Sequence, residues 1–364
     1  MTGLYNQLEL IKLSFGFFIP EVILTVAVII VIVAGLIQKE RSLLVTSFAL
    51  IGFFLSFVTL LLHWPENEST VNLFGGMLRS DSFSAYLKLL IDVSGMLTVL
   101  MTWRNQKQQH LPEYYALILT IGIGAHLLVM STNLVMVFIS LELISISSYV
   151  LTSFSFSAAG AEGSQKYFLF GSVASAVMLY GFTFLYGLSG TFAFTSQSFV
   201  DALINTDSLL FKIAGVMALS GFLFKLAAAP LHPWAPDVYE AAPMPVVAFF
   251  SVVPKLAGLG IFIRFTLALN LFGQSNFDWQ YIACIVAILS LTVGNFSALW
   301  QKRPKRLMAY SSIAQSGFLI VGLAAFIPSG INFMLFYATV YVLSNYLVFI
   351  YLQYFENMGV STLE

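Results

Sequence analysis

A lysine followed by a group of prolines is the strongest indication of chemistry in this sequence. Lys225 lies in the apolar run 216–229, and the polar, proline-rich segment 232–243 begins seven residues after it. A lysine inside a membrane helix costs about 2.5–3.5 kcal/mol on insertion scales, so it normally faces a wet or protein-lined interior. Non-helical backbone at membrane depth survives only where protein or water satisfies its polar groups. We therefore expect a broken helix near Lys225–Pro233 and a path for ions or protons beside it.

An acid and a second lysine provide possible partners for Lys225. Glu142 lies inside an apolar run with Ser145 and Tyr149 on the same helix face. A carboxylate near a lysine changes the proton affinity of both groups, so Glu142 is a candidate counter-charge, although a purely structural ion pair is the alternative. Lys255 follows a proline in the next apolar segment. It is a candidate proton acceptor, and snorkelling to an interface is the competing interpretation.

For the other charged residues, a functional interpretation is weaker. His232 can exchange protons near neutral pH, yet its proline neighbours favour a loop-bracing role equally. Lys88 and Asp92 are spaced i, i+4 and predict an intrahelical salt bridge of structural value. Asp237 and Glu240 are expected to be solvated residues or helix caps. Lys305 is explained mainly by membrane topology, with access to a water-filled cavity as the alternative.

The composition is that of a polytopic membrane protein. Of 364 residues, 59% are hydrophobic and 9% are charged, and the mean hydropathy is +0.89. Soluble domains carry about 25% charged residues. The net charge of −1 leaves no footprint for nucleic-acid binding, and the single cysteine, Cys284, excludes a disulfide framework or a cysteine-ligated cluster within the chain. We expect a lipid bilayer as partner and no nucleic acid.

Apolar windows of about 20 residues predict about eleven transmembrane helices. They fall near 17–37, 43–63, 81–103, 111–130, 132–155, 166–190, 208–229, 243–272, 279–300, 305–327 and 329–354. The first window is not expected to be a cleaved signal peptide, because no small-residue cleavage site follows it. The fold class is therefore an all-α membrane protein.

Loop charges predict the orientation. Segments after odd-numbered helices contain most of the basic residues, namely Lys39, Arg41, Arg104, Lys107, Lys166, Lys302, Arg303, Lys305 and Arg306, whereas those after even-numbered helices contain Arg79 and Lys212. Positive charge accumulates on the cytoplasmic side. We expect a bacterial-type inner (plasma) membrane protein with its N-terminus outside and the C-terminus of this chain inside.

Several motifs, in order along nearly the whole chain, resemble one family. They are Gly221-Phe-Leu-Phe-Lys225-Leu-Ala-Ala-Ala-Pro-Leu-His232-Pro-Trp-Ala-Pro-Asp237-Val-Tyr, Leu141-Glu142-Leu-Ile-Ser145, Gln165-Lys166-Tyr167-Phe168, Leu185-Tyr-Gly-Leu-Ser-Gly-Thr191, Gly294-Asn295 and Lys305-Arg306-Leu-Met-Ala-Tyr-Ser-Ser-Ile-Ala314. This set is similar to the antiporter-like, proton-translocating subunits of respiratory complex I, the NADH-quinone oxidoreductase. The Asp-Val-Tyr variant resembles the subunit N branch more than subunits L or M.

The resemblance implies specific roles. Glu142 and Lys225 would form the coupled acid–lysine pair of the input half-channel. Lys255 would be the central relay lysine, His232 a connecting residue and Lys305 an accessory on the polar axis. The subunit would be a non-redox part of a proton-translocating NADH:quinone oxidoreductase that pumps protons while quinone is reduced elsewhere. It would hold no cofactor itself, with flavin, iron–sulfur clusters and quinone in other subunits. Its partners would be membrane-arm subunits resembling A, H, J, K, L and M.

The family is built from two inverted five-helix repeats, which sets the expected organisation. Residues 1–105 would hold helices 1–3, 106–275 the first repeat (helices 4–8) and 276–364 a partial second repeat (helices 9–11). The second broken helix and the exit half-channel are not in this sequence, so we expect a fragment or shortened form of a longer subunit. Two alternatives stay open: a stand-alone cation/proton antiporter that uses the same acid and lysine, and a structural membrane-arm scaffold without a complete exit channel.

Overall fold

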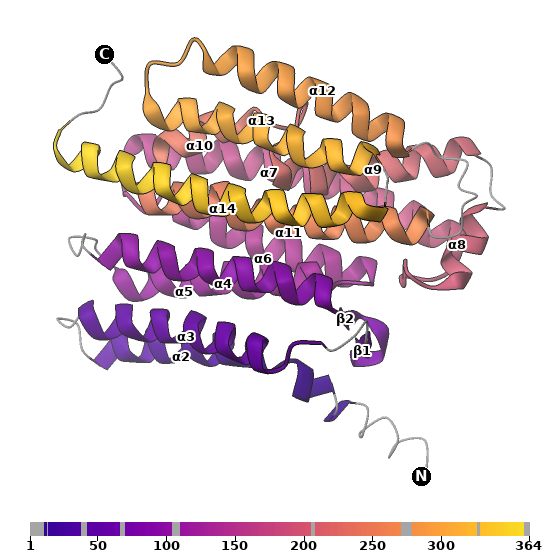
Figure 1. Ribbon diagram of the computed structural model, residues 1–364, viewed down its shortest axis with the longest axis horizontal. Helices are drawn as coiled ribbons and strands as arrows, with labels where there is room; N and C mark the ends of the chain where they lie inside the picture. The colour runs from indigo at the N-terminus through magenta and orange to yellow at the C-terminus, as the bar shows by residue number, and fades with distance from the viewer. Residues whose placement is uncertain are drawn as a thin grey trace.

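In the part of the chain that the structure describes, eleven helices are long and apolar enough to cross a membrane, and they form the body of the protein (Figure 1). The computed structural model describes residues 11–12, 14–37, 42–65, 70–103, 110–204, 208–270, 279–325 and 328–359. The crossing helices are α2 (Ile19–Ile37), α3 (Ser42–Leu62), α4 (Ser82–Trp103), α5 (Leu111–Met130), α6 (Leu134–Thr152), α7 (Ala158–Ser189), α9 (Ser208–Leu226), α11 (Met244–Asn270), α12 (Trp279–Ala298), α13 (Pro304–Ala325) and α14 (Pro328–Asn357). The prediction of about eleven spans is confirmed.

One helix begins earlier than its hydropathy predicts. The sixth window starts at 166, but α7 begins at Ala158. Its first turn is capped by Ser157, whose side-chain oxygen accepts a hydrogen bond from the backbone N–H of Gly160 at 3.0 Å. Glu162 and Lys166 then pair at 2.8 Å across one turn. A cap and an i, i+4 pair extend this helix through a polar stretch that carries no hydrophobic signal.

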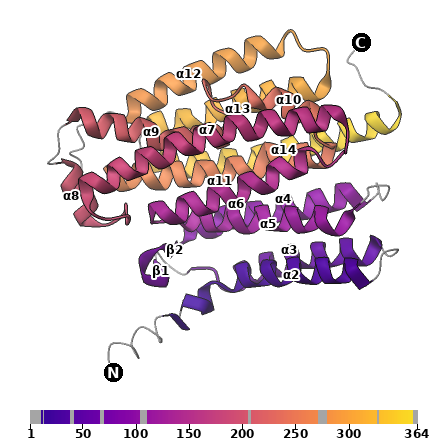
Figure 2. The same ribbon diagram turned by 180° about the vertical axis from the view of Figure 1, so that it is seen from behind.

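The crossing helices run back and forth between two faces of the bundle. One face holds α8 (Gln197–Ile204) and a small hairpin in which β1 (Val71–Leu73) pairs antiparallel with β2 (Leu78–Ser80) around a 3₁₀ turn at Phe74–Gly76. We call it the hairpin face. The opposite face holds the short helix α10 (Trp234–Ala241), and we call it the α10 face. Figures 1 and 2 show that α2 begins at the hairpin face and α14 ends at the α10 face.

Helix α11 is the centre of the bundle. It contacts α4, α5, α6, α9, α13 and α14. Its whole crossing segment is buried, whereas about a third of the α2 and α12 segments is. An apolar pattern on every side of a helix is typical of such a buried position. Lys255 and Arg264, both on α11, are therefore enclosed by neighbouring helices.

The outer surface is apolar and the charges lie inside. Large side chains such as Phe333 (70% exposed) and Phe336 (69%) on α14 point outward. Buried charged residues include Lys88, Asp92, Lys225 and Lys255. This distribution fits a lipid environment, where outward-facing apolar side chains cost nothing and charges must find partners inside.

Candidate functional site

The helix that carries Lys225 breaks where the sequence predicts. Helix α9 ends at Leu226, Ala227 has a left-handed backbone with φ +51°, and α10 begins only at Trp234. Pro230 and Pro233 lie between α9 and α10 and prevent the two helices from being continuous. The broken helix is confirmed.

The backbone groups freed by this break find partners on α12 and α13. The carbonyl of Leu226 accepts a hydrogen bond from Ser316 Oγ at 2.5 Å, and the N–H of Ala229 donates to Ser290 Oγ at 2.9 Å. Unsatisfied backbone groups would cost several kcal/mol each in the membrane interior. Two serines on neighbouring helices therefore make the break tolerable.

Lys225 lies in an apolar and aromatic setting next to the break. The residue is 2% exposed, and its Nζ has no hydrogen-bonding partner among the described residues. The nitrogen lies 5.8 Å from the ring centroids of both Tyr167 and Phe224. Tyr167 in turn stacks on Trp234 at 4.2 Å. Aromatic faces attract a desolvated ammonium but accept no proton, so Lys225 can exist with or without its charge.

Lys255 is held by uncharged oxygens. Its Nζ donates to the carbonyl of Ser312 at 2.5 Å and to Ser316 Oγ at 2.8 Å. Ser316 Oγ also donates a hydrogen bond to the carbonyl of Leu226, which is the residue after Lys225. One serine hydroxyl therefore connects Lys255 with the end of the broken helix.

A hydroxyl network extends from Lys255 towards α10 and α14. Ser312 Oγ lies 3.1 Å from Tyr239 OH and 3.3 Å from Tyr341 OH. Tyr341 donates to the carbonyl of Ser251 at 2.7 Å, and Asn345 donates to Ser251 Oγ at 2.6 Å. Hydroxyl groups both donate and accept hydrogen bonds, so such a chain can pass a proton without a buried ion at each position.

Glu142 is set apart from the two lysines. Ser175 Oγ on α7 donates to its carboxylate at 2.5 Å. The residue is half-buried and shares its face of α6 with Ile139 (50% exposed) and Ile146 (58% exposed). Because Lys225 Nζ has no partner in the described part of the chain, the acid and the lysine do not touch. Any effect of the Glu142 charge on Lys225 is therefore exerted through space.

His232 and Lys305 lie towards the α10 face. His232 is half-buried between α9 and α10, and burial lowers its pKa, an effect partly offset by a hydrogen bond with the backbone of Pro230. Lys305 Nζ donates to the carbonyl of Ala242 at 3.2 Å and pairs with Glu356 at 3.2 Å. Lys305 thus holds the end of α10 and the end of α14, away from the contacts of Lys255.

Charged residues at the α10 face join three helices. Asp237 pairs with Lys166 of α7 at 2.9 Å and with Arg306 of α13 at 3.2 Å. Glu240 pairs with Arg306 at 3.0 Å and also contacts Arg303. Asp237 and Glu240 are therefore members of an ion-pair network.

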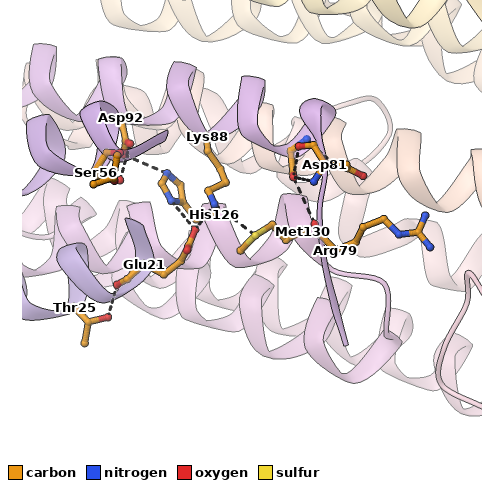
Figure 3. Close-up of polar contacts among 11 residues, drawn as sticks. Glu21, Thr25, Ser56, Arg79, Asp81, Lys88, Asp92, His126 and Met130 are labelled. Carbon is orange, nitrogen blue, oxygen red and sulfur yellow. Dashed lines mark hydrogen bonds and ion pairs between the residues drawn. The ribbon is translucent and has the colours of Figure 1, made fainter. Parts of the chain in front are cut away.

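The prediction of a salt bridge between Lys88 and Asp92 is wrong. Lys88 Nζ pairs instead with Glu21 of α2 at 2.6 Å, and Asp92 faces His126 of α5 at 3.2 Å (Figure 3). Helical spacing brings two side chains to one face, but here each charge on α4 finds an opposite charge on a neighbouring helix. Sequence reasoning missed Glu21 and His126, although each is an ionisable residue within an apolar window, and that signal was available.

Sequence reasoning also missed the groups that surround the lysines. Ser312, Ser316 and Tyr341 lie in apolar stretches where single hydroxyls carry no signal of their own. Tyr167 belongs to a motif that the sequence singled out without assigning it a role. Loop residues Lys39, Arg41, Arg104 and Lys107, used to predict orientation, lie outside the described residues. Within the described residues, no group of three or more His, Cys, Asp or Glu side chains is arranged to hold a metal ion.

Comparison with known proteins agrees with this arrangement. The family model described as "NADH:quinone oxidoreductase/Mrp antiporter, TM" matches residues 131–363. NADH-quinone oxidoreductase subunit N of Chlorobium chlorochromatii is 36% identical over 348 residues, which cover 92% of this chain and 67% of the relative. NAD(P)H-quinone oxidoreductase subunit 2 of Thermosynechococcus vestitus is 38% identical over 339 residues, covering 92% and 64%. The chain therefore spans about two thirds of the length of these relatives.

Solved structures share the fold. A chain of respiratory complex I from Thermus thermophilus with bound aureothin matches with a TM-score of 0.78 at 29% identity, covering 94% of this chain and 71% of that one. A chain of the Mrp complex from Dietzia sp. DQ12-45-1b matches with a TM-score of 0.82 at 20% identity, covering 93% and 64%, and shows the fold alone. From its broken helix, its buried lysines and these relatives, the chain belongs to the family of antiporter-like membrane subunits of NADH:quinone oxidoreductases and Mrp antiporters, among relatives named subunit N or subunit 2.

Proposed function

We propose that this chain is a membrane-arm subunit of a proton-pumping NADH-quinone oxidoreductase and carries protons through Lys225 and Lys255. The enzymatic activity belongs to the whole complex, with flavin, iron–sulfur clusters and quinone on other subunits. Its neighbours are other membrane-arm subunits. The names of the relatives support this assignment, and the geometry of Lys225 carries it.

Lys225 combines the three properties that a proton carrier needs. It is buried, it stands at the end of a broken helix, and its Nζ has no fixed partner among the described residues. A lysine locked to a carboxylate keeps its proton, whereas one that faces only aromatic rings gives up its charge at smaller cost. The absence of a contact ion pair thus favours proton exchange over a structural role.

The onward step uses Lys255 and Ser316. A proton leaving Lys225 passes to Lys255, which then donates to the Ser312 carbonyl and to Ser316 Oγ. Moving one charge across the membrane against 100 mV costs about 2.3 kcal/mol. One hydrogen bond to a charged group contributes about 1.5–3 kcal/mol. Making or breaking a single such contact at Lys255 is therefore comparable with the energy that the transfer requires.

In this proposal, Glu142 regulates proton transfer at Lys225. Its half-buried carboxylate lies on a face with exposed Ile139 and Ile146. An acid facing lipid is costly, so we propose that a neighbouring membrane-arm subunit covers this face. A change at that contact would alter the field that Glu142 exerts on Lys225. His232 and Lys305, closer to the α10 face, serve proton entry and the anchoring of α10 respectively.

We also propose an orientation in the membrane. Lys166, Arg303, Lys305 and Arg306 lie at the α10 face. Basic residues favour the cytoplasmic side. The α10 face is then cytoplasmic, as in a bacterial-type inner membrane, and protons reach Lys225 from there.

The proposal is tested by replacing Lys225 with methionine, which keeps the side-chain length but binds no proton. In vesicles containing the assembled complex, Lys225→Met should lower the number of protons pumped per NADH oxidised. The matched control is Lys212→Met, which removes an exposed lysine from the other end of the same helix. An unchanged ratio in Lys225→Met would overturn the assignment. Cation-dependent proton flux in vesicles that contain this chain alone would favour a stand-alone antiporter instead.

A further inference from the structure

A second group of buried charges lies among the first four crossing helices, where the proposed pathway does not run. Glu21 of α2, Lys88 and Asp92 of α4 and His126 of α5 converge between these helices (Figure 3). Their exposed fractions are 0%, 2%, 0% and 0%. We call these four residues the N-terminal cluster. Four ionisable side chains buried together are costly, and within membrane segments such residues mark ion or proton sites by default.

His126 is the centre of the cluster. Its Nδ1 lies 3.1 Å from Glu21 Oε1, and its Nε2 lies 3.2 Å from Asp92 Oδ1. Glu21 Oε1 is also paired with Lys88, and Asp92 Oδ2 accepts a hydrogen bond from Ser56 at 2.7 Å. A neutral imidazole donates from one nitrogen only, whereas the imidazolium donates from both. Carboxylates at both ring nitrogens therefore suit the charged ring.

The charges balance only when one proton is added. Two carboxylates and one ammonium leave a single negative charge, which a proton on His126 neutralises. Burying an unbalanced charge costs several kcal/mol. Glu21 Oε2, Asp92 Oδ1 and His126 Nε2 nevertheless lack an aligned hydrogen-bonding partner among the described residues. One added proton would therefore balance the cluster, whose groups are not locked around it.

A narrow pocket leads from the hairpin face to Lys88. Exposed Gly16 and His63 stand at its outer part, half-buried Thr59 lines it, and Lys88 lies at its inner end. Its volume is about 20 Å³, which is room for one water molecule. At 1.5 Å per residue along α4, Lys88 lies about 9 Å and Asp92 about 15 Å below the start of the helix. The cluster therefore reaches from near the hairpin face towards the middle of the membrane.

Helix α4 separates the cluster from the lysines of the proposed pathway. Leu87, which lies about 100° round the helix from Lys88, packs at Gly260 of α11, so a different side of α4 meets the central helix. Glu21 of α2 and Asp92 of α4 contact the ring of His126, and Lys88 of α4 contacts Glu21. On the other helices packed against α5, Arg264 of α11 is bound by Asp81 and Glu142 of α6 is bound by Ser175, and His63 follows the end of α3.

We propose that the N-terminal cluster is a second proton-binding site, centred on His126 and open to the aqueous phase at the hairpin face. His126 takes up a proton to form the imidazolium between Glu21 and Asp92, and releases it to the aqueous phase through the pocket, past Lys88, which keeps its own proton. No other bond changes. The site is independent of Lys225 and Lys255, and it faces the side opposite to the α10 face.

The test measures deuterium exchange at the C2 position of each histidine by mass spectrometry, in the assembled complex and over a range of pH. This exchange needs solvent access and follows protonation of the ring. His126 should exchange, with a sigmoidal dependence on pH. Asp92→Asn should lower the pH of the midpoint by about 1 unit, because a nearby carboxylate favours the charged ring by that amount or more. His110, which lies 3.9 Å from Glu113 at an exposed position, is the reference.

Two further variants separate access from protonation. Gly16→Leu, which fills open space in the outer part of the pocket, should slow the exchange of His126 and leave the midpoint unchanged. Ser56→Ala removes the hydroxyl bound to Asp92 without changing any charge, and should shift the midpoint less than Asp92→Asn does. If His126 of the wild-type complex does not exchange while His110 does, the cluster is a sealed ion pair and the proposal is overturned. That result would leave the proposal for Lys225 untouched, because the test of Lys225 measures proton pumping.

Discussion

The protein accommodates buried lysines in two different ways. In the N-terminal cluster, Lys88 contacts the carboxylate of Glu21 at 2.6 Å. On the central axis, Lys225 Nζ faces aromatic rings and has no hydrogen-bonding partner among the described residues, and Lys255 Nζ bonds a carbonyl and a hydroxyl. A contact ion pair fixes the charge of both partners, whereas rings and neutral oxygens allow an amine to change its charge. The same side chain is therefore held as a permanent ion in one region and, in the proposed function, as an exchangeable one in the other.

The largest effect should come from breaking the ion pair of the N-terminal cluster. Lys88→Met leaves the carboxylate of Glu21 buried without its ammonium partner, which should destabilise the protein by about 3–5 kcal/mol. Thermal unfolding of the purified complex measures the loss. The double variant Lys88→Met with Glu21→Gln removes both charges and should recover most of the stability. Equal stability of Lys88→Met and wild type would mean that the ion pair between Lys88 and Glu21 does not stabilise the protein.

A smaller effect should come from the pair that ties α4 to the central helix. Arg264 donates to both carboxylate oxygens of Asp81, at 2.7 and 2.9 Å. Burial raises the pKa of Asp81, but the hydrogen bonds and charge of Arg264, with bonds from Ser84, outweigh it and hold the pKa below the usual 3.8. The carboxylate is thus more acidic in the folded than in the unfolded chain. Its contribution is complete above about pH 4 and is lost as the pH falls through the lowered value.

Asp81→Asn should therefore unfold more easily than wild type by about 1.5–3 kcal/mol at neutral pH. The difference between the two proteins should stay constant between about pH 5 and 8 and shrink below about pH 4, where the wild-type carboxylate becomes protonated. Thermal unfolding at a series of pH values gives both curves. A difference that grows as the pH falls would contradict the assignment of the pair.

Much of this arrangement follows from the sequence, for local reasons. Runs of apolar residues predict the crossing helices, and Pro230 and Pro233 predict the break after Lys225. The partners of the buried charges do not follow, because they come from helices that only packing brings together. Ser316 is 61 residues from Lys255, and His126 is 105 residues from Glu21. The prediction of a Lys88–Asp92 salt bridge is wrong for the same reason. Their i, i+4 spacing indicates a pair, but helix packing brings Glu21 to Lys88 and His126 to Asp92.

The smallest effect on stability should come from Lys225, the lysine to which we assign proton exchange. Lys225→Met removes an amine whose Nζ has no hydrogen-bonding partner in the described part of the chain, so no contact ion pair is broken. A methionine of similar length replaces it among Tyr167, Phe224 and the α11 backbone, and an unsatisfied polar group costs about 1–3 kcal/mol when buried. We expect thermal unfolding of this variant to be unchanged or to occur at a higher temperature, in contrast to Lys88→Met. A loss of stability as large as that of Lys88→Met would show that Lys225 also has a fixed counter-charge, and the distinction between the two regions would disappear.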